Sequence, residues 1–140
     1  MYIFDGAMGT MLQAAGLEEG YCPELFNVER PEVVKNIHTQ YLQHGSDVIT
    51  TNTFGACGLK LEDYNLQDRV KEINIAAVKV AKKAIAEFKP SARVAGSMGP
   101  TGRFLQPLGN MSFDSIYDTY REQAEALIEG GVDFIIIETI

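Results

Sequence analysis

The stretch Val132-Asp133-Phe134-Ile135-Ile136-Ile137 decides the fold of this chain. Its last four residues are apolar without interruption, whereas a strand with one face in water alternates apolar and polar residues. The run therefore predicts a strand of a parallel sheet that is buried on both faces. Parallel strands need long crossover connections, and these are usually helices.

Amphipathic segments separate the short apolar runs along the chain. Strands are expected at residues 2–4, 47–50, 93–97 and 132–137. Long helices are expected at residues 31–43, 68–88 and 113–129, where apolar residues recur three and four positions apart. Pro31 suits a first helical position, Gly45 suits a helix stop, and Ser112 suits an N-cap.

The predicted fold is α/β, with about four parallel strands joined by crossover helices, which is the N-terminal half of a (β/α)8 TIM barrel. A closed barrel has eight such units and about 250 residues. A doubly wound sheet is the alternative, but it would need a helix after the last strand, and the chain stops soon after Ile137. We therefore expect residues 1–140 to be a single partial domain of a larger barrel enzyme.

Composition excludes several classes of function. Hydrophobic residues make up 46% and charged residues 22%, which is typical of folded globular proteins. The net charge is −7 and no basic stripe occurs, so no nucleic-acid partner is expected. No apolar run approaches the roughly 20 residues that span a membrane, and the N-terminus does not resemble a signal peptide. We expect a cytoplasmic protein with no membrane partner, in which Cys22 and Cys57 are reduced thiols.

Polar or glycine-rich segments follow every expected strand, at residues 5–10, 51–56, 97–102 and 138–139. In parallel β/α folds these segments meet at one end of the sheet, where active sites lie. Asp5 and Glu138 could hold a cation there, and glycine backbones could donate N–H groups to an anion. These features suit an α-amino acid. The structural alternatives are that Asp5 caps a following helix and that Glu138 frays.

An ordered series of motifs resembles the homocysteine S-methyltransferase family. In chain order the motifs are DGAMGTML at residues 5–12, ELFN at 24–27 with PEVV at 31–34, GSDVITTNTFGA at 45–56, and GSMGPTG at 96–102. The resemblance covers essentially the whole chain, and the ordered series is far more specific than any single motif. The sequence is most similar to the homocysteine-binding domain of the cobalamin-dependent members.

The resemblance implies a barrel that binds homocysteine and a zinc ion. Zinc lowers the pKa of the homocysteine thiol, so that a thiolate attacks the methyl donor. In the cobalamin-dependent members this donor is methylcobalamin, carried on another domain. By position, the resemblance assigns these substrate-site residues: Asp5 and Glu138 for the ammonium, the backbone around Gly6, Ala7, Ser97 and Met98 for the carboxylate, and Thr51, Asn52 and Thr53 at the pocket mouth.

The family's zinc ligands are three cysteines in the second half of the barrel, and neither Cys22 nor Cys57 falls in such a motif. We therefore expect the chain alone to hold no zinc and to be inactive in methyl transfer. Its expected partner is the remaining half of the barrel or a second copy of the chain. The alternative functions are a self-contained amino-acid-binding module and a self-associating half-barrel scaffold that buries its sheet edges. A half-barrel also predicts exposed apolar surface beyond that of ordinary monomers.

Overall fold

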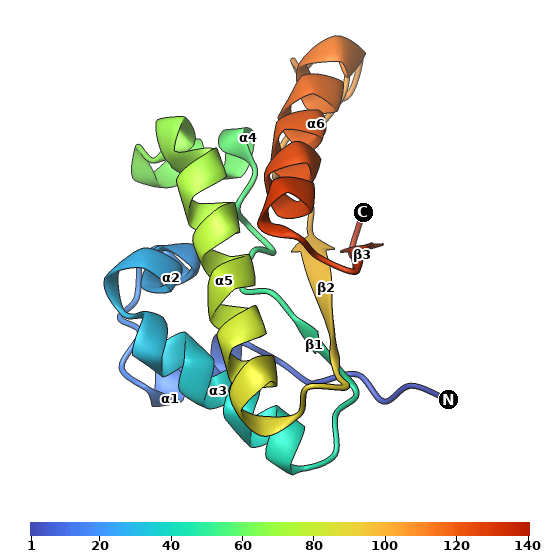
Figure 1. Cartoon of the computed structure of the whole chain (residues 1–140). Coiled ribbons are helices and arrows are strands. Elements are labelled where there is room, and N and C mark those ends of the chain that lie inside the picture. Colours follow the sequence, from blue (N-terminus) through green and yellow to red (C-terminus); the bar gives the residue numbers. More distant parts are fainter.

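A three-stranded parallel sheet forms the centre of the protein in a computed structural model that describes all 140 residues (Figure 1). The strands are β1 (Val48–Thr50), β2 (Arg93–Met98) and β3 (Phe134–Ile137), in the order β1-β2-β3. Both strand pairs are parallel, with Val48 opposite Arg93 and Ala95 opposite Phe134. The carboxyl ends of all three strands therefore lie at the same end of the sheet.

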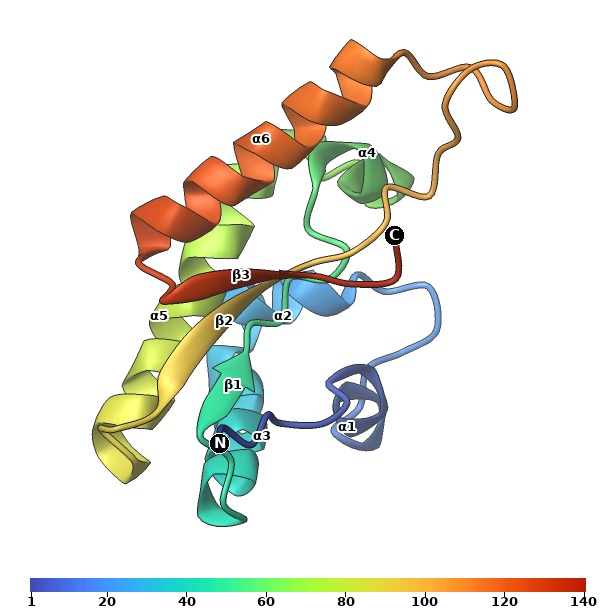
Figure 2. The same ribbon diagram turned by 90° about the vertical axis from the view of Figure 1, so that its right-hand side faces the viewer.

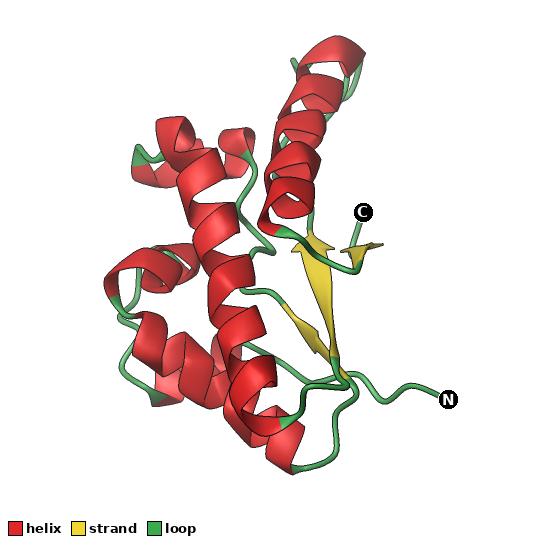
Figure 3. Ribbon diagram, viewed as in Figure 1, coloured by secondary structure: helices red, strands yellow, loops and turns green.

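Helices connect the strands and lie together on one side of the sheet (Figure 3). The long helices are α3 (Pro31–Gln43), α5 (Val70–Phe88) and α6 (Phe113–Gly130). The short ones are α1 (Gly9–Ala14), α2 (Phe26–Glu29) and α4 (Gly58–Leu61), with 3-10 turns at Pro23–Leu25, Glu62–Tyr64 and Gln67–Arg69. Ser112 accepts a hydrogen bond from the Ser115 N–H, which confirms the predicted N-cap of α6. None of the helices combines the length and apolar character needed to cross a membrane.

The predicted first strand is not a strand in the structure, so the expectation of about four strands is wrong at this point. Phe4 forms a single parallel bridge with Val48. The Ile3 carbonyl accepts the Val48 N–H at 3.1 Å, and the Asp5 N–H donates to the Val48 carbonyl at 3.0 Å. The segment lies in a strand's position beside β1, but its side chains are exposed and its pairing is too short to count as a strand.

The core lies between the sheet and the helices. Ile49 of β1 and Val94 of β2 pack with Ala81 and Ala84 of α5, and Leu42 of α3 closes the same cluster. Each buried aliphatic side chain of this size contributes about 1.5–3 kcal/mol to stability. This packing fixes β1 and β2 against the helices, and so fixes the loops that leave their carboxyl ends.

No residue of β3 is fully buried, contrary to the prediction of burial on both faces: the end residues are exposed, and Ile135 and Ile136 are half-buried. Phe134 is 36% exposed and Ile137 is 68% exposed. Figure 2 shows the strands in front of the helices, with no helix over the near face and no neighbour along the outer edge of β3. The apolar sequence of β3 therefore lacks the contacts that would bury it. Further large apolar side chains are exposed between β2 and the first residue of α6, at Phe104, Leu108 and Phe113.

Candidate functional site

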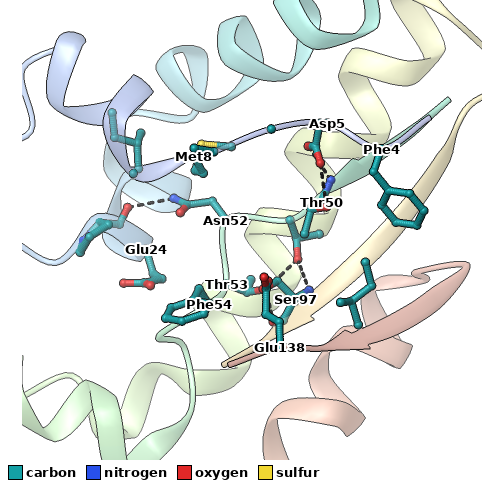
Figure 4. A pocket seen from close by; sticks show the side chains of 17 residues that line it. Phe4, Asp5, Met8, Glu24, Thr50, Asn52, Thr53, Phe54, Ser97 and Glu138 are labelled. Atoms are coloured by element: carbon teal, nitrogen blue, oxygen red, sulfur yellow. Dashed lines mark hydrogen bonds between the residues drawn. The ribbon is translucent and has the colours of Figure 1, made fainter. Parts of the chain in front are cut away.

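A cavity of about 500 Å³ opens at the carboxyl ends of the strands (Figure 4). This volume is within the range of small-molecule sites, roughly 300–1,000 Å³. We call it the strand-end pocket. Its lining residues are Phe4, Asp5, Gly6, Ala7, Met8, Gly9, Leu12, Pro23, Glu24, Thr50, Thr51, Asn52, Thr53, Phe54, Ser97, Ile136 and Glu138. The segments after residues 2–4, β1 and β3 thus meet near the end of β2, as the sequence predicts, with Ser97 as the lining residue from β2.

The structure brings together all but one of the residues predicted for the substrate site, and the exception is Met98. Its side chain is 5% exposed and packs with Val78 and Leu127 in the core. Successive side chains of a strand point to opposite faces, so Ser97 and Met98 cannot both face the pocket. The Met98 side chain is therefore a core residue. The segment 99–102 also lies outside the pocket lining.

Asp5 is held at the pocket wall by Thr50. The Thr50 N–H donates to one carboxylate oxygen of Asp5 and the Thr50 hydroxyl donates to the other, each at 2.8 Å. Burial raises the pKa of Asp5, the Thr50 hydrogen bonds oppose this, and the negative charge of Glu138 raises it further. The N-cap of α1 is Met8, which makes no side-chain cap, so Asp5 does not cap that helix.

Glu138 is ordered by the end of β2. Its Oε1 accepts the Ser97 hydroxyl at 2.6 Å, and its N–H donates to the Met98 carbonyl at 3.0 Å. Figure 4 shows Glu138 and Asp5 at different walls of the pocket. No lysine or arginine lines the pocket. Two carboxylates without a basic partner could accommodate a cationic group.

The loop between β1 and α4 (residues 51–57, the β1–α4 loop) forms a polar wall. The hydroxyl oxygens of Thr51 and Thr53 lie 2.6 Å apart. The Thr53 hydroxyl donates to the Ser97 carbonyl at 2.7 Å, and the Ser97 N–H donates to the Thr51 hydroxyl at 3.1 Å. These buried bonds join the β1–α4 loop to the end of β2.

A glycine allows close approach of an aromatic ring beneath the pocket. A side chain at Gly6 would place its first carbon 3.0 Å from the Tyr41 hydroxyl oxygen. With glycine present, the Tyr41 hydroxyl donates to the Ala7 carbonyl at 2.7 Å. The N–H groups of Gly6 and Ala7 donate no hydrogen bond within the chain. They are therefore free donors at the pocket wall, suited to an anion.

Glu24 is a third carboxylate in the pocket lining, and the sequence reasoning missed it as a site residue. It is 6% exposed, and it accepts the Gly55 N–H at 2.7 Å and the Cys22 thiol at 3.4 Å. A side chain at Gly55 would come within 2.8 Å of the Glu24 carboxylate. The only sequence signal for Glu24 is its position within the ELFN motif.

The residues present do not fit the zinc ion that the resemblance implies. Burial, with the Glu24 charge, raises the pKa of the Cys22 thiol to about 12, and burial also raises the pKa of Cys57. Without a metal ion both residues are therefore buried, protonated thiols, and neither belongs to a group of side chains that could hold zinc. The structure contains no group of three or more histidine, cysteine, aspartate or glutamate side chains that could hold a metal ion.

These features define a class: a parallel α/β protein with a carboxylate-lined pocket at the strand ends. A model of the homocysteine S-methyltransferase family matches residues 2–140. The methionine synthases of Mycobacterium tuberculosis (strain ATCC 25618 / H37Rv) and Mycobacterium leprae (strain TN) are 40% and 37% identical to this chain over 145 residues. The chain belongs to the homocysteine S-methyltransferase family, whose members are methyltransferases.

Solved structures of the homocysteine methyltransferase MmuM from Escherichia coli share the fold. The metallated form has a TM-score of 0.81 and 28% identity, covering 99% of this chain and 54% of that one. The oxidized form has a TM-score of 0.78 and 27% identity, covering 96% of this chain and 51% of that one. This chain spans about half the length of these solved chains and 12% of the two methionine synthases.

Proposed function

We propose that this chain is the N-terminal half of the homocysteine-binding barrel of a methyltransferase of the methionine synthase type. The observation that carries the proposal is the pairing of Asp5 and Glu138 in a pocket that no lysine or arginine lines. The reaction of such an enzyme transfers a methyl group to the thiol of homocysteine and gives methionine.

Homocysteine matches the charges of the strand-end pocket. Its ammonium would lie between Asp5 and Glu138. The positive charge would favour the ionised form of Asp5 and so oppose the effect of burial, which raises the pKa of that residue. Its carboxylate would accept the free N–H groups of Gly6 and Ala7. The side chain would then extend along the wall that Thr51, Asn52 and Thr53 form, toward the centre of the barrel.

In this proposal the chain binds and orients homocysteine but does not activate its thiol. Zinc, when bound in a domain of this family, lowers the pKa of the thiol. The cysteine ligands that the resemblance implies correspond to no residue of this chain, so we expect no methyl transfer by the chain alone. The donor would be methylcobalamin carried on another domain of the parent enzyme.

Calorimetric titration of the chain with homocysteine tests the proposed function. We expect saturable binding at one site. Two analogues serve as controls: 4-mercaptobutyrate lacks the ammonium, and 3-mercaptopropylamine lacks the carboxylate. Each should bind at least about tenfold more weakly, which corresponds to about 1.4 kcal/mol. A folded chain that ignores homocysteine, or that binds 4-mercaptobutyrate equally well, would contradict the proposal.

We also propose a partner for the exposed side of β3. An apolar groove of about 530 Å³, the α6–β3 groove, is lined by Met98, Leu105, Phe113, Ile116, Tyr117, Tyr120, Arg121, Ala124, Ile135 and Ile137. The outer edge of β3 is unpaired, and the solved relatives are about twice as long as this chain. The occupant that fits both facts is the remaining half of a family barrel, which would continue the sheet and cover the groove.

Dye binding and solution mass test this partner. The chain alone should bind a hydrophobic dye, and adding the second half of the methionine synthase barrel from M. tuberculosis should suppress the dye signal and give a one-to-one complex. A stable dimer of the chain that binds no dye would contradict the proposal. That outcome would make a second copy the occupant, as in a half-barrel scaffold. A dye-free monomer would instead favour a self-contained binding module.

A further inference from the structure

Four buried side chains hold the backbone of the β1–α4 loop, and each comes from a different element. Three of them donate to loop carbonyls: Asn27 of α2 to Asn52 at 2.7 Å, Gln123 of α6 to Thr53 at 2.8 Å, and Asn74 of α5 to Ala56 at 2.9 Å. The fourth, Glu24, accepts the Gly55 N–H at 2.7 Å. All four side chains are at most 6% exposed. Three of them, all except Glu24, lie outside the pocket lining.

Gln123 is the side chain that connects the most segments. Besides the Thr53 carbonyl, its Nε2 lies 3.3 Å from the Asn74 side-chain oxygen and 3.5 Å from the Ser97 carbonyl. It therefore joins α5, the β1–α4 loop and the end of β2. Ser97 in turn donates to Glu138, so the same network reaches the carboxylate that we assign to the substrate ammonium.

The burial of Gln123 is not explained by packing. It is fully buried on α6, and its side-chain oxygen has no hydrogen-bond partner. A buried polar group without a partner costs about 1–3 kcal/mol, and an apolar residue of similar size would avoid this cost. An amide at this position therefore contributes something that an apolar side chain cannot, and the donor bond to the Thr53 carbonyl is that contribution.

We propose that Gln123 and Asn74 are positioning residues of the strand-end pocket. They fix the backbone of residues 53–56, so that Thr51, Asn52 and Thr53 are already in place when the ligand arrives. Without the Gln123 amide, the Thr53 carbonyl retains the bond from the Ala56 N–H at 3.0 Å. The loop would then occupy several conformations, and ligand binding would have to order it. This inference rests on the proposed function for its ligand.

The variant Gln123→Met tests the proposal because it removes the amide donor while keeping the length of the side chain. The matched control is Val78→Ala, since Val78 is also fully buried and packs with Leu127 of α6 in a core cluster that includes no residue of the loop. The readouts are the Kd for homocysteine, the hydrogen-exchange rates of the Gly55 and Ala56 amides, and the melting temperature of each variant.

We expect Gln123→Met to raise the Kd for homocysteine about tenfold and to speed exchange of both loop amides. Val78→Ala should lower the melting temperature at least as much, yet leave the Kd within about twofold of the wild type. Unchanged Kd and exchange rates in Gln123→Met would overturn the proposal. An equal rise in Kd in Val78→Ala would also overturn it, because general destabilisation would then explain the effect.

Failure of this inference can be distinguished from failure of the proposed function. If the wild-type chain does not bind homocysteine, the proposed function falls, and the exchange rates of the Gly55 and Ala56 amides decide the positioning role alone. If Gln123→Met does not fold, Asn74→Leu replaces it, because this variant removes the donor to the Ala56 carbonyl. The same comparison with Val78→Ala then supports or overturns the proposal.

Discussion

β2 and β3 are neighbouring apolar strands with opposite surroundings. β2 pairs on both sides and is buried from Val94 to Met98. β3 pairs on one side, and its end residues Phe134 and Ile137 are 36% and 68% exposed. An apolar run therefore indicates which surroundings a strand requires, and the structure shows that β2 has them and β3 does not.

The same difference separates the two cavities. The strand-end pocket lies at the ends of the paired strands β1 and β2, and buried hydrogen bonds hold its polar wall in place. The α6–β3 groove lies between α6 and the edge strand β3, and its only charged lining residue is Arg121. We therefore assign ligand binding to the first and packing against a partner to the second.

The first prediction compares the stability lost by truncating a buried residue of β1 with that lost by truncating an exposed residue of β3, and it has the largest expected magnitude. Ile49→Ala in β1 should lower the free energy of unfolding by about 2–5 kcal/mol, because Ile49 is fully buried and the change leaves a cavity. Ile137→Ala in β3 removes the same atoms from an exposed position and should cost less than about 1 kcal/mol. Urea unfolding measures both. Equal losses would show that β3 is covered in solution.

The second prediction concerns the helix layer on the covered side. His38 is fully buried and neither ring nitrogen has a hydrogen-bond partner. Burial lowers its pKa from 6.5 to about 4. The unfolded chain binds a proton near pH 6.5 and the folded chain only near pH 4, so stability is present above pH 6.5 and is lost as the pH falls to about 4. The total loss is roughly 3 kcal/mol.

Variants at the two histidines check this pH dependence. His38→Leu should abolish most of the slope of unfolding free energy between pH 7 and pH 5, as measured in urea. His44→Gln should keep the slope, because His44 lies exposed after α3. A slope that survives in His38→Leu would show that other groups produce it.

The third prediction concerns the strand-end pocket. Asp5→Asn should raise the Kd for homocysteine about tenfold, or about 1.4 kcal/mol, because it removes a charge from the ammonium site. The raised pKa of Asp5 means that its ionised form destabilises the unliganded fold, and this penalty develops as the pH rises through that pKa. The variant should therefore lack this pH-dependent loss of stability while binding less well.

The pH dependence of binding adds a control. Binding an ammonium requires ionised Asp5, so wild-type affinity should fall as the pH drops through the raised pKa, above the ordinary value of 3.8. The affinity of Asp5→Asn for homocysteine should not show this pH dependence. Glu18→Gln, at an exposed carboxylate outside the pocket, should behave as the wild type in calorimetry. Identical affinities of Asp5→Asn and wild type would remove Asp5 from the site.

The smallest expected effect concerns α6, beside the uncovered groove. Ser112→Ala removes the N-cap bond to the Ser115 N–H and should cost about 1 kcal/mol of stability. Ser91→Ala changes an exposed serine with no side-chain hydrogen bond and should cost nothing measurable. Thermal unfolding compares the two. Equal melting temperatures would indicate that the first turn of α6 is frayed in solution.

The parts of the fold that were predicted correctly are those that depend on local sequence signals. The bounds of α3 follow from a proline that starts the helix and a glycine that stops it, and the start of α6 follows from Ser112. The prediction failed for residues 2–4 and for the burial of β3, because both depend on neighbours that a local pattern does not contain. The periodicity of a helix is visible in its own sequence, whereas the burial of a strand depends on the segments that pack beside it.

The candidate site likewise contains some residues that could be predicted from the sequence and others that could not. Asp5 and Glu138 could be predicted because parallel strands bring their carboxyl ends together. Met98 was assigned to the site through its backbone, and this stays a prediction, whereas strand alternation places its side chain in the core. Gln123 could not be found, since its acceptor is the carbonyl of Thr53, 70 residues away along the chain, and such a contact leaves no periodic pattern.

Chemical-shift mapping of the labelled chain during a homocysteine titration tests most directly whether the strand-end pocket is the homocysteine site. Saturable shifts are expected at the amides of Gly6, Ala7 and Ser97 and along the β1–α4 loop, with Phe113 and Tyr117 of the α6–β3 groove unchanged. Shifts confined to the groove, or no shifts at saturating homocysteine, would contradict the assignment of the strand-end pocket as the homocysteine site.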